Sequence, residues 1–319
     1  MLRLIMLCIV GLVCHPAVAQ DYPSKQIKLV VQFSAGGGAD LIARMIGAEL
    51  QTTFNQAVVV DNRPGANGAI ANQAVASAPP DGYTLLVSAA GPMVVNPHLY
   101  GKAAVDTIRD FVPIAGLAES KFTVVVHPDL PVRTIQELTA YAKSRPGKLN
   151  YSSSGSGGSP HLAGELYRAM AGVDMVHIPY KGLSPAITDL IGAKVDLTFA
   201  DIIVVAPFLK AGQIRAIGIT GLRRSPLLPD VATLNESGLP GYQAGTWYAL
   251  HGSASLPPAI VEKLNLAVRA ILARPAVKAR LAVAGLEGVD LTPAQFAAYQ
   301  QADYDKWGKL IKSAGIKGE

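Results

Sequence analysis

Two loops rich in glycine and serine carry the residue types best suited to holding a ligand. In the first, residues 34–40 (SAGGGAD) follow an apolar run and lead into a segment with helical spacing. In the second, residues 152–159 (SSSGSGGS) lead in the same way into a helix that opens at Pro160-His161. Glycine lets a backbone approach a ligand closely, and the first N–H groups of a helix have no intrahelical acceptor. Each loop is therefore suited to binding an anion through backbone amides, without lysine or arginine.

The same loops also have an interpretation without a ligand. Glycine-rich turns are common, and Asp40 is as well suited to capping a helix as to contacting a ligand. Leu41 stands where a G-x-G-x-x-G motif needs its last glycine, and the sequence has neither a Gly-Lys-Ser/Thr phosphate loop nor a G-x-S-x-G nucleophile elbow. The six histidines form no H-E-x-x-H motif or close pair that would favour a metal site. Of these, we place only His161 near a ligand, with packing or capping as an equal alternative.

Composition and charge exclude several classes of protein. The 319 residues are 50% hydrophobic and 16% charged, which is typical of a well-packed globular chain. The net charge of +5 is too small to indicate nucleic-acid binding. Both cysteines, Cys8 and Cys14, lie before residue 20, so we expect no thiol chemistry, disulfide or cysteine-bound metal in the rest of the chain.

The first 19 residues have the features of a secretory signal peptide. Arg3 is followed by an apolar run over residues 4–14 and by Ala17-Val18-Ala19, an A-x-A cleavage pattern. The run is shorter than the roughly 20 residues that span a bilayer. We therefore expect cleavage after Ala19 and export to the periplasm. Cys14 as a lipoprotein cysteine is the disfavoured alternative, because the bulky Val13 precedes it.

Short apolar runs alternate with longer helical patterns along the rest of the chain, which is typical of βαβ units. We expect strands at residues 27–33, 57–61, 84–88, 122–126, 149–152, 175–178, 195–199, 214–219 and 245–251. The chain is long enough for two domains of about 100–200 residues. The predicted fold is α/β, with two mixed, mostly parallel sheets flanked by helices. We assign residues 20–121 plus 245–319 to lobe 1 and residues 122–244 to lobe 2, with the ligand cleft and hinge between them.

Several motifs along the whole chain carry a resemblance to a known family. They include residues 33–37 (FSAGG), 62–66 (NRPGA), 80–86 (PDGYTLL), 148–151 (KLNY), 176–182 (VHIPYKG) and 228–231 (LPDV). With these motifs the chain resembles the Bug-type periplasmic solute-binding proteins of tripartite tricarboxylate transporters. The resemblance implies a two-lobed "Venus flytrap" whose loops meet a carboxylate with backbone amides and hydroxyls. The chain departs from the family at Gln32 and Ser34, where proline commonly flanks the phenylalanine, and at Ser152-Ser153-Ser154, where an Ala-Ser-x run is more usual. These extra polar groups at the pocket wall suggest an altered ligand.

The resemblance also implies a set of ligand-binding residues. In lobe 1 the contacts are Phe33, Ser34, Gly37, Ala39 and Asp40, with Ser88 and Ala90 as neighbours. In lobe 2 they are Ser154, Gly157, Gly158 and Ser159, with His161 behind them. Asp201 either faces the far end of the ligand or caps the following helix. Trp247 and Tyr248 either line the cleft near the hinge or belong to the core.

The function we expect is capture of a small organic acid, a mono- or dicarboxylate that could also be aromatic or an amino acid. A monomer without cofactor, metal or catalytic residues would hand this ligand to the membrane subunits of a tripartite transporter. One alternative partner is a sensor-kinase ectodomain. A less favoured alternative is a hydrolase of the same fold that uses a loop serine with His161, because no nucleophile–base set is visible in the sequence.

Overall fold

The structure, a computed structural model, describes residues 22–100 and 105–314, so the predicted signal peptide and both cysteines lie outside the described residues. The first part of the chain forms β1 (Ile27–Val31), α1 (Gly38–Phe54), β2 (Val58–Asn62), η1 (Ala66–Gly68), α2 (Ala69–Ala76), β3 (Thr84–Ala89), η2 (Gly91–Val95) and α3 (Asn96–Tyr100). The middle forms β4 (Phe111–Val126), α4 (Ile135–Lys143), β5 (Asn150–Ser153), α5 (Ser159–Ala171), β6 (Val176–Pro179), α6 (Leu183–Ile191), β7 (Leu197–Asp201), α7 (Ile202–Lys210) and β8 (Arg215–Ile219). The last part forms β9 (Gly245–Ser253), α8 (Pro258–Ala273), α9 (Pro275–Val283), β10 (Leu286–Gly288) and α10 (Pro293–Ala314).

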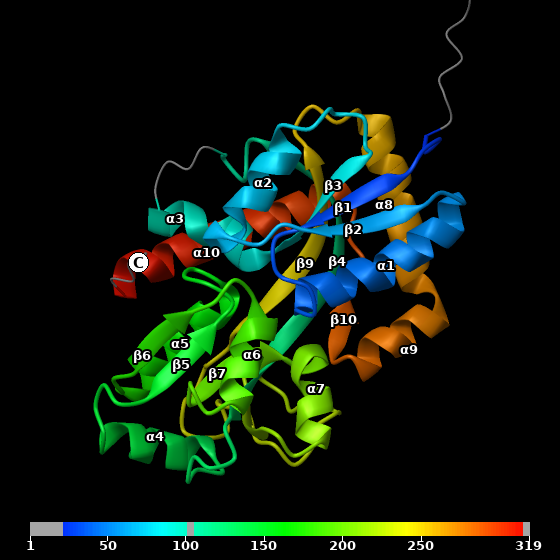
Figure 1. The fold of residues 1–319 in the computed structure, drawn as a ribbon. Coiled ribbons are helices and arrows are strands. Elements are labelled where there is room, and N and C mark those ends of the chain that lie inside the picture. Colours follow the sequence, from blue (N-terminus) through cyan, green and yellow to red (C-terminus); the bar gives the residue numbers. More distant parts are fainter. Residues whose placement is uncertain (1–21, 101–104, 315–319) are drawn as a thin grey trace, which may run out of the picture.

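The strands form two mixed sheets that share β4. In one, β1 lies between β2 and β3 in parallel, and in the other β5 lies between β6 and β7 in parallel. The antiparallel pairs all include β4 or β9: β9 pairs with β3 and β4, and β4 also pairs with β7, β8 and β10. Helices cover the sheets (Figure 1). The predicted α/β fold with mixed sheets flanked by helices is confirmed.

Strand β4 passes from one sheet into the other (Figure 1). Residues 111–121 pair with β9 along its whole length, whereas residues 122–126 pair with β7 and β8. The sequence pattern predicts only the apolar second half as a strand. The first half contains Pro113 and Gly116, and the register shifts next to both residues, so its alternation is broken. The chain therefore passes between the two halves of the molecule along β4, and β9 pairs with the part of β4 next to this passage.

Each half has its own apolar core. Leu29, Ile42 and Leu264 belong to a buried cluster made from β1, β3, β4, α1 and α8. Tyr151 and Phe199 belong to another, made from β4, β5, β7, α4 and α5. The division of the core favours two lobes, and their exact boundaries stay a prediction.

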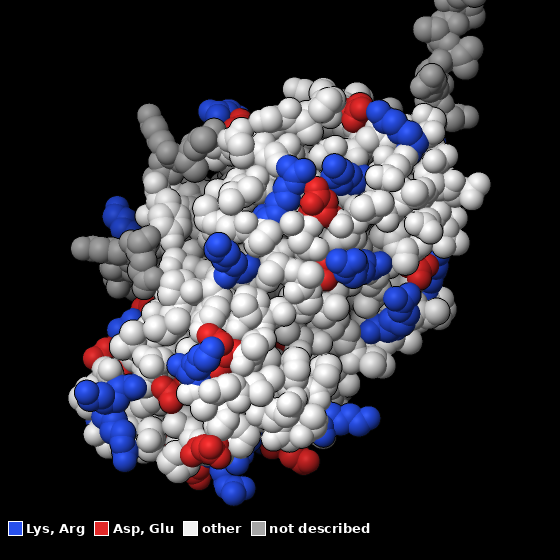
Figure 2. All heavy atoms as spheres, in the orientation of Figure 1, with Lys and Arg blue, Asp and Glu red and all other residues white. Residues whose placement is uncertain are grey.

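Charged side chains of both signs are interspersed over the face shown in Figure 2, without a broad area of one sign. Many form ion pairs, such as Lys25 with Asp81 at 3.2 Å and Arg63 with Asp61 at 3.0 Å. Within residues 22–100 and 105–314, no helix is both long enough and apolar enough to cross a membrane.

Candidate ligand cleft

A small cavity of about 30 Å³ lies where the two halves meet. Six of the predicted site residues line it: Phe33, Gly37, Ala39, Ser154, Ser159 and Asp201. The remaining lining residues are Gly38, Ala89, Gly91, Pro92, Phe122, Pro160, Leu183, Thr246 and Tyr248. Because they come from both halves, the structure brings the two predicted loops together at one place.

The first loop delivers the start of α1 to this cavity. Gly37, the residue before the helix, is extended, and no side chain caps the helix start. Gly36 has φ +80°, a left-handed conformation that glycine adopts without strain and that turns the chain from β1 into α1. The first N–H groups of α1 are therefore open to an acceptor in the cavity, with the positive end of the helix dipole behind them.

The second loop delivers the start of α5 from the other half. Gly158 precedes the helix in an extended conformation, again without a side-chain cap. Gly155 (φ +135°) and Gly157 (φ +79°) shape the turn, in which the Gly158 N–H donates to the Gly155 carbonyl oxygen at 2.9 Å. The hydroxyl of Ser159 reaches across to Thr246 Oγ1 of β9 at 3.3 Å. Two uncapped helix starts thus face one cavity.

The two halves touch around the cavity. A methyl group built on Gly91 of η2 would lie 2.9 Å from both Gly158 Cα and the Ser159 nitrogen. The Ser34 N–H donates to the Lys181 carbonyl oxygen at 3.3 Å. Ser34 also lies against Gly182, which follows Lys181 in the loop of lobe 2. Ser34 therefore forms part of the contact between the halves and not of the cavity wall.

Asp201, at the end of β7, is the acidic side chain of the cavity wall. It is 1% exposed, and its Oδ2 accepts a 2.7 Å hydrogen bond from the Tyr248 hydroxyl of β9. Its Oδ1 is buried without a hydrogen-bond partner among the described residues. Burial raises the pKa of this carboxyl, against the opposing effect of the Ser120 and Tyr248 hydroxyls. Asp201 makes no side-chain cap to α7, so of the two predicted roles its placement favours facing the ligand.

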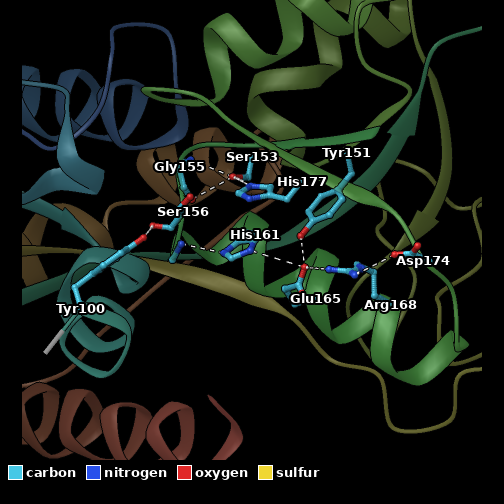
Figure 3. Close-up of polar contacts among 11 residues, drawn as sticks. Tyr100, Tyr151, Ser153, Gly155, Ser156, His161, Glu165, Arg168, Asp174 and His177 are labelled. Atoms are coloured by element: carbon cyan, nitrogen blue, oxygen red, sulfur yellow. Dashed lines mark hydrogen bonds and ion pairs between the residues drawn. The ribbon is translucent and has the colours of Figure 1, made fainter. Parts of the chain in front are cut away.

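His161 lies behind the second loop (Figure 3). Its Nδ1 accepts a 2.9 Å hydrogen bond from the Gly157 N–H, and its ring stacks on His177 with centroids 4.0 Å apart. Its Nε2 faces Glu165 Oε1 at 3.8 Å, and that carboxylate also accepts a 2.6 Å bond from the Tyr151 hydroxyl. His161 is therefore placed to shape the loop, and it does not line the cavity.

Other predicted residues lie outside the cavity wall. Asp40 accepts from the Gly36 N–H at 2.9 Å and lies 2.9 Å from the Arg44 guanidinium. Although burial raises its pKa, the hydrogen bonds from Arg44 and Gly36 outweigh this and lower the pKa of Asp40 below its usual value. The Asp40 carboxylate thus closes the turn before α1, which favours a structural role for it without making it the helix cap considered from the sequence.

Ser88 and Ala90 are part of the lobe 1 core. The Ser88 hydroxyl is 2.9 Å from His251 Nδ1, whose Nε2 is 2.8 Å from Gln300 Oε1. Gln32 donates to Asn72 Oδ1 at 2.6 Å and accepts from the Ala89 N–H at 2.8 Å. The departure of Gln32 from the family pattern therefore concerns a buried network and not the wall of the cavity.

Several wall residues escaped the sequence reasoning. Gly91 and Pro92 form a Gly-Pro pair after β3, which is a turn signal that was not connected with a ligand site, and Thr246 is the second residue of β9. Tyr248 lines the cavity, whereas its neighbour Trp247 packs in the core and donates to Asp303 Oδ2 at 2.9 Å. Alternation along β9 separates these two aromatic side chains, because successive residues of a strand point to opposite faces.

No cluster of three or more metal-ligating side chains occurs in the described part of the chain.

A larger groove of about 1320 Å³ adjoins the cavity at Pro92. Its walls again come from both halves, including Asn67, Asn96, Tyr180 and Lys181. The groove therefore lies beside the cavity at the boundary between the lobes.

A model of the tripartite tricarboxylate transporter family receptor matches residues 42–316. The chain belongs to this receptor family. A solved structure of an R. palustris protein with adipate has a TM-score of 0.91 and 35% identity, covering 93% of this chain and 99% of that one. Periplasmic binding protein BugD has a TM-score of 0.88 and 33% identity, over 93% and 100% of the two chains. MatC from Rhodopseudomonas palustris with bound malate has a TM-score of 0.86 and 32% identity, over 91% and 100%.

These relatives confirm the resemblance found in the sequence and the periplasmic-binding-protein fold. The receptors of tripartite tricarboxylate transporters are binding proteins and not enzymes. The serine of a hydrolase site would need a histidine beside it at the cavity, yet His161 Nδ1 is bonded to Gly157 and the Ser159 hydroxyl to Thr246. The structure therefore does not support a pairing of Ser159 with His161 for hydrolysis.

Proposed function

We propose that this receptor captures a small organic acid in the periplasm between lobe 1 (20–121 plus 245–319) and lobe 2 (122–244), and presents it to the membrane subunits of a tripartite transporter. The observation that carries the proposal is the pair of uncapped helix starts, α1 and α5, that face one cavity from opposite lobes. A carboxylate held between them accepts hydrogen bonds from the N–H groups of both helix starts. Its binding therefore favours the arrangement in which the two lobes are closed on each other.

The size of the cavity supports entry by lobe movement. About 30 Å³ accommodates one or two water-sized groups, which is less than a whole dicarboxylate needs. Rotation about the two strands that connect the lobes, β4 and β9, widens the cleft. We propose that the carboxylate head binds at the cavity, while the rest of a longer ligand extends toward the groove near Asn67 and Lys181.

The ligand class follows from the same walls. Ser154 and Ser159 supply hydroxyls, and no lysine or arginine lines the cavity among the described residues. The structures of relatives with adipate and with malate support small carboxylates as the first compounds to test. Selectivity within that class rests on Asp201 and on the groove.

A ligand screen tests the proposal directly. The chain from Gln20 onward is melted with mono- and dicarboxylates, aromatic acids and amino acids, beginning with adipate and malate. A ligand at 100 times its Kd stabilises the folded state by about 2.7 kcal/mol, an increase in Tm of several degrees. Failure of every compound to raise the Tm or to give heat in calorimetry would refute the proposal. Ser154→Ala with Ser159→Ala should weaken binding of whichever acid is found.

Export and the partner need separate measurements. N-terminal sequencing of protein from the periplasmic fraction should give Gln20 as the first residue. Pull-down by the ligand-loaded protein should recover transporter membrane subunits, and recovery of a sensor-kinase ectodomain instead would replace the proposed partner.

A further inference from the structure

Asp201 lines the cleft, and one of its carboxyl oxygens has no hydrogen-bond partner among the described residues. Oδ2 is bonded to Tyr248, whereas the Ser120 hydroxyl, which lies close enough to lower the pKa of this carboxyl, donates to the Lys121 carbonyl oxygen at 3.2 Å. Oδ1 is left buried and without a partner among the described residues. An isolated buried carboxylate is costly, and such groups usually acquire either a partner or a proton.

The proposed anion position lies next to this carboxyl. Gly38 is the first residue of α1, and a methyl group built on it would lie 2.8 Å from Asp201 Oδ2 and in contact with the Tyr248 hydroxyl. A carboxylate at the start of α1 is therefore a close neighbour of Asp201. The described wall of the cavity contains no cationic side chain that could separate the two negative charges.

Two carboxylates at short distance in a site with little water do not both remain ionised. A proton on Asp201 removes the repulsion. Because Oδ2 already accepts the Tyr248 hydrogen bond, that proton belongs on Oδ1, which then becomes a hydrogen-bond donor. The same atom that is unsatisfied in the free protein would then donate to the ligand.

We propose that the receptor binds its organic anion together with one proton, which is carried on Asp201 Oδ1. This proposal rests on the proposed function and adds a co-ligand to it. Asp201 becomes the residue that sets both the pH dependence of binding and the preference for an acceptor at this end of the ligand.

Other titratable groups on the elements around Asp201 have partners of their own. They are Asp40 with Arg44 and Glu49 with Arg274 on α1, Glu119 with Lys121 on β4, Tyr151 with Glu165 on β5, His161 with Gly157 and Arg168 with Glu165 on α5, Asp189 with Lys194 on α6, and His251 with Ser88 on β9. Lys210 lies in the last turn of α7, at the opposite end of that helix from Asp201. Asp201 and Tyr248 are thus the titratable side chains of the described cavity wall.

Calorimetry measures the proton directly. Adipate, succinate and malate are titrated into the protein at pH 7 to 9, where carboxylic acids are ionised, in buffers of different ionisation enthalpy. We expect uptake of up to one proton per ligand, and an association constant that falls by up to about tenfold for each pH unit gained. Asp201→Asn keeps a neutral donor of similar size, so it should bind the anion without proton uptake and with a flat pH profile.

Asp189→Asn is the matched control. Asp189 also accepts a 2.7 Å hydrogen bond from a tyrosine hydroxyl, that of Tyr180, but it does not line the cavity. Proton uptake should persist in this variant. The calorimetry of the unmodified protein decides the question even if Asp201→Asn does not fold.

Four outcomes are distinguishable. Binding of an anion without proton uptake overturns the proposal, as does uptake that survives in Asp201→Asn. Binding of malate but not succinate, again without uptake, would mean that an ionised Asp201 accepts from the ligand hydroxyl. Absence of binding by any acid rejects the proposed function itself.

Discussion

Gly91 gives the sharpest test of how the lobes come together. It is the first residue of η2 in lobe 1, and its φ is not positive, so its backbone conformation is one that alanine also adopts. The added methyl would meet Gly158 Cα at 2.9 Å, the Ser159 nitrogen at 2.9 Å and the Gly157 carbonyl oxygen at 3.0 Å. All three are backbone atoms of the opposite lobe, so no side chain can rotate to relieve the contact.

The size of the effect follows from these distances. Carbon atoms pack at about 3.5–4.0 Å, so the loop before α5 must withdraw by about 0.6–1 Å. Overpacking of this kind costs about 1–3 kcal/mol, which corresponds to a loss of ligand affinity of roughly 5- to 150-fold. Folding should be unaffected, because the three atoms nearest to the added methyl group all belong to the opposite lobe.

The assay compares Gly91→Ala with Gly192→Ala. Gly192 ends α6 with φ −80°, and a methyl group there has its nearest neighbour at 3.5 Å. Calorimetric titration with the acid that gives the largest thermal shift should find weakened binding only in Gly91→Ala, with the ligand-free Tm of both variants near that of the parent. Equal affinity of Gly91→Ala and the parent would mean that the ligand complex does not bring Gly91 against the start of α5, and the closure reasoning would fail.

Three further perturbations follow from buried groups. Burial lowers the pKa of His251 to about 4, so as the pH falls the histidine is protonated in the unfolded chain before it is protonated in the folded protein. The free energy of unfolding should therefore be unaffected by this group above pH 6.5 and fall by about 3 kcal/mol toward pH 4. Urea unfolding should show a smaller fall in His251→Gln. His161→Ala leaves the Gly157 N–H without its acceptor and should weaken ligand binding by about 1–3 kcal/mol in calorimetry, whereas His161→Asn, whose Oδ1 can replace Nδ1, should recover most of it. Asp40→Ala removes the acceptor of the Gly36 N–H and should lower the free energy of unfolding by about 1 kcal/mol. A larger effect on ligand affinity than on stability would instead indicate that Asp40 contacts the ligand.

Local sequence signals located the elements and the two loops. Proline is favoured in the first turn of a helix, and the last three helices begin at Pro258, Pro275 and Pro293. Glycine runs after apolar strands predicted the helix starts that line the cavity. These signals work because they concern residues next to one another in the chain, where backbone conformation decides the outcome.

Long-range contacts account for what the sequence did not predict. Nothing near Asp40 in sequence says whether its carboxylate turns to Arg44 or to a ligand. Tyr248 reaches Asp201 across 47 positions of chain, and Ser88 meets His251 across 163. The full length of β4 was hidden because its first half pairs through bulges, where alternation fails as a signal.

The position of the hinge assigns different tasks to the two kinds of contact in the cleft. Phe122, Thr246 and Tyr248 come from the crossing strands, so Asp201 lies beside the axis about which the lobes would turn. Gly91 and the start of α5 belong to opposite lobes and separate when the lobes open. A contact near an axis changes little on rotation, whereas one that bridges the lobes changes most. Substitution of Gly91 should therefore weaken every ligand by a similar factor, while substitution of Asp201 should alter the order of preference among ligands and its dependence on pH.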